Sequence, residues 1–157
     1  MIIVDTREKK NAHILEYFDK NGIFYTLKKL DVADYSLEEN EKVCVDRKQN
    51  LEEVSYNLMN KKDHSRFWKE VRRAKEKGIK MIVLCEHGGS ITDIKSVSKW
   101  HSLYTTVSGR TLMDEIYRVH ISYGVEFLFC KKCDTGRIIN EILTGTYKGE
   151  ATNESQN

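Results

Sequence analysis

Residues 81–85, Met-Ile-Val-Leu-Cys, form an unbroken apolar run that ends at the acidic Glu86. A short continuous run of this kind is typical of a strand buried on both faces, which occurs mainly where helices cover both sides of a sheet. The run therefore predicts an α/β fold. It also places Glu86 at the carboxyl end of a central strand, where such folds collect their functional groups.

The rest of the chain alternates between strand-like and helix-like segments. Strands are expected at 2–4, 23–30, 43–48 and 125–130, and helices at 11–20, 51–59, 65–77, 110–122 and 134–143. A hairpin should join residues 31–37 to 43–48, and residues 88–109 should form a loop with a helical turn near 94–100. We therefore predict one domain over residues 1–147, a central mixed sheet flanked by helices on both faces, followed by a disordered polar tail at 148–157.

The composition is that of a soluble protein. The chain has 157 residues, 39% hydrophobic and 32% charged, and no apolar run approaches the roughly 20 residues that a membrane span needs. We expect a cytoplasmic protein that crosses no membrane and keeps its four cysteines as free thiols. Cys130 and Cys133 have the spacing of zinc ligands, but no second pair completes a set of four.

Positive charge is concentrated in one segment. The formal net charge is only +2, yet residues 61–80 hold nine Lys or Arg against three acids. This segment includes Lys69 and Arg73, and it has two readings. It is either an ordinary solvated helix face or a surface that binds the phosphates of a nucleic acid.

The strand at 43–48 carries an acid and a lysine on one face. Side chains alternate along a strand, so Asp46 and Lys48 point the same way, and Asp34 lies on the other arm of the predicted hairpin. Metal-dependent hydrolysis of a phosphodiester uses such a set, because carboxylates hold the cation and a lysine acts beside the attacking water. An exposed strand with an ion pair is the alternative. Glu52, in the first turn of the next helix, can return toward Asp46 and Lys48.

Five motifs in this order resemble the nuclease domain of the XPF family of structure-specific endonucleases, which includes the archaeal Hef nuclease and belongs to the PD-(D/E)XK superfamily. The resemblance covers roughly residues 2–143, and its motifs are Val4-Asp5-Thr6-Arg7-Glu8, Ala33-Asp34-Tyr35, Asp46-Arg47-Lys48 followed by Glu52, Ser65-Arg66-Phe67-Trp68-Lys69-Glu70, and Val83-Leu84-Cys85-Glu86. The resemblance implies a restriction-endonuclease-like nuclease core.

The chain departs from the family pattern at three points. Ala33 stands where the family has glycine. Asp46 replaces Glu and Glu52 replaces Asp, so the two acids exchange lengths while the number of carboxylates is kept. The sequence also stops where family enzymes continue into a helix-hairpin-helix module, so we expect that a separate partner could supply DNA binding.

The resemblance also implies roles for individual residues. Mg²⁺ or Mn²⁺ would be the cofactor, held by Asp34, Asp46, Asp5 and Glu52, with Lys48 beside the attacking water and Glu8 completing the catalytic group. Arg7, Arg66, Arg47, Lys69 and Arg73 would bind DNA or brace the acids; for Arg47 bracing is favoured, because strand alternation sends it to the opposite face. An apolar stripe such as Ile138, Ile139 and Ile142 most often belongs to the core. Family domains pair through the last strand and helix, so the same stripe is also a candidate for a homodimer face.

The expected function is metal-dependent cleavage of branched or structured DNA, such as a flap, fork or junction, in repair, recombination or the replication of a mobile element. One alternative is an inactive DNA-binding or dimerisation module of the same fold. Another is an RNA-processing or restriction-type nuclease. The sequence has no aromatic stacking motif of the single-stranded RNA kind and no recognisable base-reading helix, which favours recognition of shape or phosphates.

Overall fold

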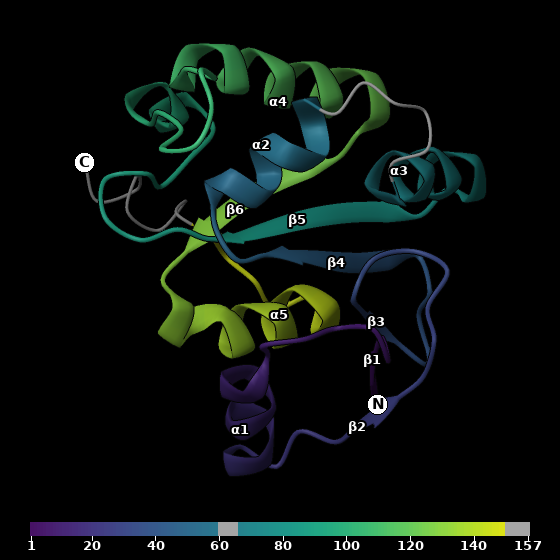
Figure 1. Cartoon of the computed structure of the whole chain (residues 1–157). Helices are drawn as coiled ribbons and strands as arrows, with labels where there is room; N and C mark the ends of the chain where they lie inside the picture. Colours follow the sequence, from purple (N-terminus) through teal and green to yellow (C-terminus); the bar gives the residue numbers. More distant parts are fainter. Residues whose placement is uncertain (60–65, 150–157) are drawn as a thin grey trace.

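The computed structural model describes residues 1–59 and 66–149. These residues form one six-stranded sheet, in the order β2-β1-β3-β4-β5-β6, with helices packed on both faces (Figure 1). The strands are β1 (Ile2–Val4), β2 (Tyr25–Leu27), β3 (Tyr35–Leu37), β4 (Val43–Lys48), β5 (Lys80–Glu86) and β6 (Glu126–Cys130). The helices are α1 (Ala12–Lys20), α2 (Leu51–Met59), α3 (Arg66–Lys77), α4 (Gly109–Tyr123) and α5 (Thr135–Thr144), with short 3-10 turns η1 (Lys95–Lys99) and η2 (Lys132–Asp134). The predicted α/β fold is confirmed.

The sheet is mixed, and its centre holds the apolar run. β4, β5 and β6 are parallel to one another, and β1 is parallel to β2, while β3 runs antiparallel to both β1 and β4. The β3–β4 pair is the predicted hairpin, with Tyr35 opposite Val45. In β5, Met81 to Cys85 are all buried, because helices cover both faces of this strand.

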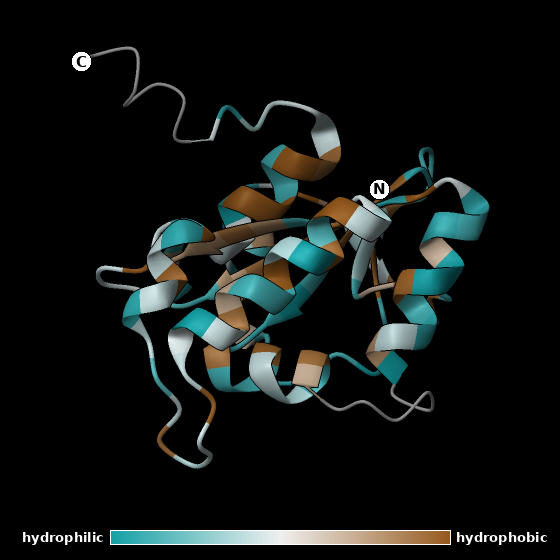
Figure 2. Ribbon diagram, turned by 90° about the horizontal axis from the view of Figure 1, so that it is seen from above, coloured by the Kyte–Doolittle hydropathy of each residue, from teal (hydrophilic) through white to brown (hydrophobic). Residues whose placement is uncertain are grey.

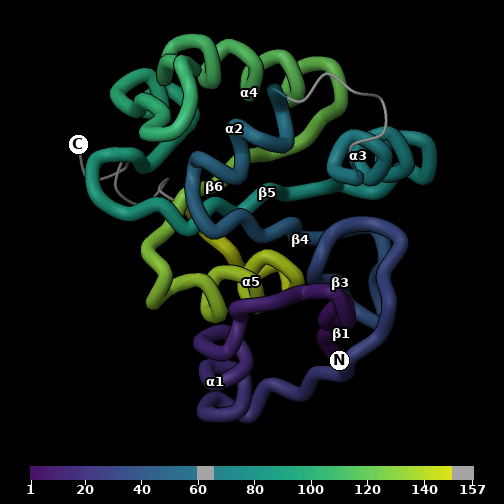
Figure 3. Tube along the Cα trace, viewed as in Figure 1, coloured from purple at the N-terminus to yellow at the C-terminus, as the bar shows by residue number. Residues whose placement is uncertain are grey.

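Two apolar cores lie on the two faces of the sheet. α2, α3 and α4 pack on one face, where Phe67, Val71 and Leu112 join Cys44 and Val83 of the sheet. α1 and α5 lie side by side on the other face (Figure 3). Each helix shows hydrophobic and hydrophilic bands along its length (Figure 2), which is the amphipathic pattern of a helix that packs one side on a core.

Three details differ from the sequence-based expectation. The strand predicted at 23–30 shortens to Tyr25–Leu27, because β2 is an edge strand, and Leu27 is exposed. Ala33 has a φ of 63°, in the left-handed region that favours glycine. The alanine that replaces the family glycine therefore strains the backbone at this position.

The third difference concerns the proposed homodimer face. Ile138, Ile139 and Ile142 are buried within the chain itself, where α5 packs on the sheet and on α1. The expectation that this stripe is free to bind a second copy is therefore wrong. The stripe belongs to the core.

All four cysteines are free, as expected; Cys130 is buried with its Sγ 3.6 Å from Thr135 Oγ1, and Cys133 is exposed. No helix among the described residues is long and apolar enough to cross a membrane. Ser65, the basic residues Lys61 and Lys62, and positions 150–157 of the predicted tail lie outside the described residues.

Candidate active site

β4 sends its charged side chains to two faces of the sheet. Asp46 and Lys48 lie on the side of α3, where Lys48 Nζ is 2.8 Å from Asp46 Oδ2 and 4.7 Å from the centre of the Phe67 ring. Both residues are largely buried. Burial alone would lower the pKa of Lys48, but Asp46 and then Asp34 outweigh this effect and raise the pKa, so the amine is held as an ammonium.

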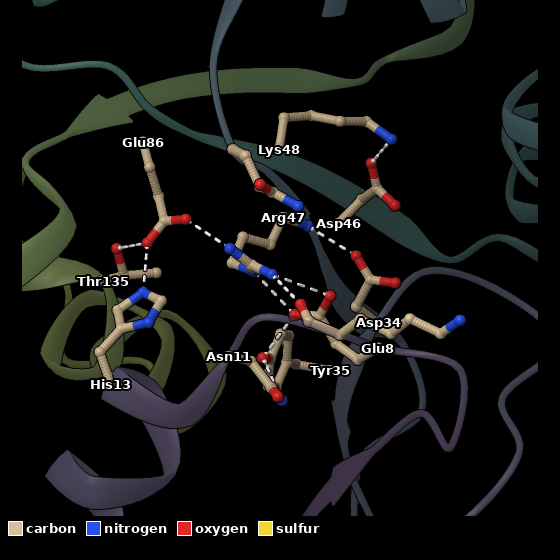
Figure 4. Close-up of polar contacts among 12 residues, drawn as sticks. Glu8, Asn11, His13, Asp34, Tyr35, Asp46, Arg47, Lys48, Glu86 and Thr135 are labelled. Carbon is tan, nitrogen blue, oxygen red and sulfur yellow. Dashed lines mark hydrogen bonds and ion pairs between the residues drawn. The ribbon is translucent and has the colours of Figure 1, made fainter. Parts of the chain in front are cut away.

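Asp34 is fixed beside this pair by the hairpin. Its N–H donates to the carbonyl of Val45 (3.0 Å), and its Oδ2 accepts from the N–H of Arg47 (2.8 Å). Burial raises the pKa of Asp34 well above its usual value, and the neighbouring Asp46 raises the pKa further. Asp46 of β4 and Asp34, the residue before β3, therefore lie next to each other, and burial disfavours the negative charge of Asp34 (Figure 4).

Glu70 is a further acid on the same side of the sheet, and the sequence analysis gave it no role. It lies in α3, is only 5% exposed, and has Oε1 3.7 Å from Arg66 Nε. Burial, followed by Asp46, raises the pKa of Glu70 to about 7, against the opposing effect of Arg66. A signal was present, because Glu70 has the helical spacing of the buried residues Phe67, Val71 and Ala74.

Arg47 lies on the opposite face and joins two other acids. Its Nε and one terminal nitrogen donate to the two carboxylate oxygens of Glu8 (2.7 and 3.1 Å), and its other terminal nitrogen donates to Glu86 Oε1 (Figure 4). The same guanidinium donates to the carbonyl of Lys9 (2.6 Å), and its side chain is 2% exposed. Arg47 is thus a buried brace between the ends of β1, β4 and β5.

Glu86 is held by helices as well as by Arg47. Its Oε2 contacts His13 Nε2 of α1 (2.5 Å) and accepts from Thr135 Oγ1 of α5 (2.6 Å). Burial would raise the pKa of Glu86, but the hydrogen bonds from Thr135, His13 and Arg47 outweigh it and lower the pKa. No sequence pattern marked His13 or Thr135, because their partner is distant in the chain.

Asp5 is also fully engaged. Its Oδ1 accepts from the N–H of Leu30 (3.0 Å), and its Oδ2 accepts from Arg7 (3.0 Å) and Arg66 (3.2 Å). Its side chain is buried, so in this structure Asp5 anchors the two arginines and presents no spare oxygen to a cation. Arg7 and Arg66 keep exposed surface and can still face a substrate.

The expectation that Glu52 returns toward Asp46 and Lys48 is wrong. Glu52 accepts from Ser102 Oγ (2.9 Å) and from the N–H of Leu103 (2.8 Å), so it holds the loop before α4 instead. Two residues of the basic helix α3 that were predicted to bind DNA differ in their surroundings. Lys69 is exposed, whereas Arg73 donates a hydrogen bond to the carbonyl of Asp31.

The remaining acids fit a magnesium-type cation. Among residues 1–59 and 66–149, no three acidic, His or Cys side chains converge closely enough to form a metal cage. Mg²⁺ does not need one, since it keeps several waters and binds through one or two carboxylates together with substrate phosphates. Asp46 Oδ2 is buried and accepts no regular hydrogen bond, although the Lys48 ammonium lies beside it. Asp34 and Asp46 therefore fit the role of ligands to such an ion, with Glu70 as a further acid on the same side of the sheet.

The raised pKa of Glu70 predicts a pH-dependent stability. Between the usual value near 4.5 and about 7, the unfolded state binds fewer protons than the folded state, so the free energy of unfolding falls as pH rises through this window. We expect Glu70→Gln to reduce that fall by about 1 to 3 kcal/mol. Urea unfolding at pH 4.5 and pH 8 with a chelator checks this, with Glu76→Gln, an exposed acid on the same helix, as the control. An unchanged fall in Glu70→Gln would contradict the assignment.

Comparison with known proteins gives the family to which this fold, with its paired acids on a β hairpin, belongs. Residues 4–142 match the model of the ERCC4 domain, and the chain belongs to this family. XPF from Aeropyrum pernix is similar in structure, with 15% identity and a TM-score of 0.68 over 99% of this chain and 69% of that one. A second structure, XPF from Aeropyrum pernix in complex with DNA, has 16% identity and a TM-score of 0.67 over 92% of this chain and 64% of that one. No curated protein matches the sequence.

Proposed function

We propose that this protein is a metal-dependent endonuclease that cleaves phosphodiester bonds in branched or structured DNA. The observation that carries the proposal is that Asp34 lies next to the buried ion pair of Asp46 and Lys48, whose Oδ2 and Nζ atoms are 2.8 Å apart. Burial raises the pKa of Asp34, and repulsion from the neighbouring Asp46 raises the pKa further. A bound Mg²⁺ or Mn²⁺ would relieve this repulsion.

Each group would have a defined task. Asp34 and Asp46 would hold the cation, which would neutralise charge on the scissile phosphate and make a bound water more acidic. Lys48, kept protonated by Asp46, would donate a hydrogen bond to a phosphate oxygen or orient the water. Arg47, Glu8 and Glu86 would keep β4 in place from the other face of the sheet, without touching the substrate.

DNA would approach along α3. This helix starts beside the site, where Arg66 contacts Asp5, and it exposes Lys69. The similar XPF structure from Aeropyrum pernix was determined in complex with DNA. These observations support DNA as the substrate, and the mostly basic sequence of α3 supports contact with phosphates.

Cleavage of a DNA panel tests the proposal. The purified protein with Mg²⁺ or Mn²⁺ is expected to nick a flap, fork or junction faster than a blunt duplex of the same length, and a chelator should stop the reaction. Cleavage of RNA in preference to DNA would favour an RNA-processing role. Absence of cleavage on every branched substrate, with DNA binding retained, would favour an inactive binding module.

Asp34→Asn separates metal binding from folding. Because burial and the neighbouring Asp46 disfavour the charge of the Asp34 carboxylate, the asparagine variant should have a higher free energy of unfolding than the wild type at pH 8 without metal. The same variant should lose the rise in melting temperature that millimolar Mn²⁺ gives the wild type by binding the folded state.

Calorimetry and thermal unfolding with and without Mn²⁺ measure both effects. Asp19→Asn, which removes an exposed acid at the end of α1, is the matched control and should change neither. A metal-induced stabilisation of equal size in Asp34→Asn would rule out Asp34 as a ligand.

We also propose that a homodimer, if it forms, uses the edge strand β6, because the Ile138 stripe of α5 is internal. Sedimentation of the wild type against Leu128→Lys, at a partly exposed position of β6, tests this. Unchanged self-association in the variant would place the interface elsewhere.

A further inference from the structure

A hollow of about 510 Å³ lies between α2 and the loop that precedes α4. Tyr56 and Met59 of α2 line one side, and Tyr104 and Val107 of the loop line the other. Its volume is within the range of pockets that hold small organic groups. Neither the paired acids nor the Arg47 brace contributes to it.

The aromatic residues at this hollow are unusually exposed. Tyr104 is 83% exposed, Leu103 77% and Tyr56 72%. Large apolar side chains gathered at one exposed place are a common sign of a binding surface. The two tyrosines are 48 positions apart in the sequence, which explains why no aromatic motif was visible before the chain was folded.

The loop is held in shape rather than left loose. Ser102 N–H donates to the carbonyl of Val107 (3.1 Å), and Ser102 Oγ accepts from the N–H groups of Tyr104 (3.1 Å) and Thr105 (3.0 Å). Ser102 Oγ also donates to Glu52 (2.9 Å), which fastens the loop to α2. A loop shaped in advance loses less entropy when it binds a ligand.

The hollow lies on the helix that follows the proposed active site in the chain. α2 begins three residues after Lys48, and Glu52, which fastens the loop, is in its first turn. A DNA strand whose phosphate lies at Lys48 and Asp46 can therefore place a neighbouring nucleotide over α2. This continuity gives Glu52 a role, since its carboxylate fixes the loop that carries Tyr104.

The charge and composition of the loop suit a nucleic acid. Residues 88–109 contain Lys95 and Lys99 against one acid, Asp93, together with several Ser and Thr, and Arg110 follows. Glu52, which also lines the hollow, has its carboxylate bound by Ser102 and by the N–H of Leu103. A positive segment with exposed aromatic rings is the combination that binds single strands, because cations attract the backbone while rings stack on the bases. A purely apolar partner would need no such charge.

We propose that this hollow binds one unpaired base of the DNA substrate, stacked on Tyr104 with Tyr56 opposite. The inference rests on the proposed function and narrows its substrate to DNA with a single-stranded segment next to the cleaved bond. The preference for branched DNA then comes from a base that only an unpaired strand can supply. A continuous duplex keeps its bases stacked and cannot fill the hollow without paying to unstack one.

The test measures binding in a chelator, where no cleavage occurs. A fork with unpaired arms carries 2-aminopurine near the branch, and its fluorescence falls when the base stacks on a ring. Tyr104→Ala and Tyr56→Ala should each weaken fork binding on the order of tenfold and abolish the fluorescence change. Tyr104→Phe should keep both, because the ring rather than the hydroxyl is required. All of these variants should bind a blunt duplex like the wild type.

Phe24→Ala is the matched control, since Phe24 is 79% exposed but precedes the edge strand β2. Unchanged fork binding in Tyr104→Ala, or equal losses for fork and duplex, would overturn the inference while leaving cleavage by Asp34, Asp46 and Lys48 intact. Loss of self-association in Tyr104→Ala without a change in fork binding would likewise overturn it and assign the hollow to a second copy. If the fluorescence showed a base stacking on Tyr104 but the protein cleaved no DNA with metal, the proposed nuclease function would be wrong and the base-binding site would stand.

Discussion

Replacement of Lys48 by alanine is expected to lower the rate of DNA cleavage at least about 100-fold while leaving fork binding within about twofold. The amine is buried, lies 2.8 Å from Asp46 and is kept charged by Asp46 and Asp34, so it is available as a positioned donor at the phosphate. In the proposals made above, DNA binding would depend instead on the exposed cations of α3 and on the hollow at α2. A residue that acts mainly on the chemical step loses turnover and not affinity.

The variant needs a control for folding, because removal of Lys48 leaves the Asp46 carboxylate buried without its ion pair. Rates are therefore compared per mole of folded protein, with the melting temperature measured alongside. Lys80→Ala removes a paired lysine at the other end of the neighbouring strand β5, 2.9 Å from Glu126, and should cleave like the wild type. Chelator-sensitive cleavage by Lys48→Ala at the wild-type rate would show that the amine has no part in the reaction.

The strands that carry the site were predictable because their signals are local. Alternation along residues 43–48 fixed Asp46 and Lys48 on one face and Arg47 on the other, and the structure has this arrangement. The continuous apolar run at 81–85 correctly indicated a strand covered on both sides. These features depend on neighbouring residues and on periodicity, so one sequence was sufficient.

The partners of the acids were not predictable in the same way. Glu52 has the reach to return toward Lys48, but the loop at Ser102, 50 residues later, offers it two donors and determines its direction. The Ile138 stripe fits either a dimer face or a core, and only the position of α1 decides between them. Glu70 is an acid in a helix rich in Lys and Arg, a composition typical of an exposed helix face. Its burial depends on how α3 packs on the sheet, which the sequence of the helix alone does not show.

The largest expected effect on folding comes from Arg47. Its side chain is 2% exposed and joins the carboxylates of Glu8 and Glu86, which are themselves 8% and 3% exposed. Arg47→Ala would leave Glu8 buried without a cation and Glu86 with only His13 and Thr135 as partners, and breaking a buried pair in this way typically costs about 3 to 5 kcal/mol. We therefore expect a loss of this size in the free energy of unfolding. Arg47→Lys should recover only part of it, because one ammonium cannot reproduce a guanidinium that bonds both acids and the carbonyl of Lys9.

Urea unfolding measures these losses, and Arg137→Ala supplies the contrast. Arg137 also joins two acids, Asp134 and Glu141, but it is 47% exposed on α5, so its removal should cost less than about 0.5 kcal/mol. A double variant, Arg47→Met with Glu8→Gln, should be less destabilised than the sum of its two single variants, because the second change removes a charge that the first leaves unpaired. Equal losses for Arg47→Ala and Arg137→Ala would mean that the buried acids do not need this guanidinium. The sheet would then have to hold β4 in place by packing alone.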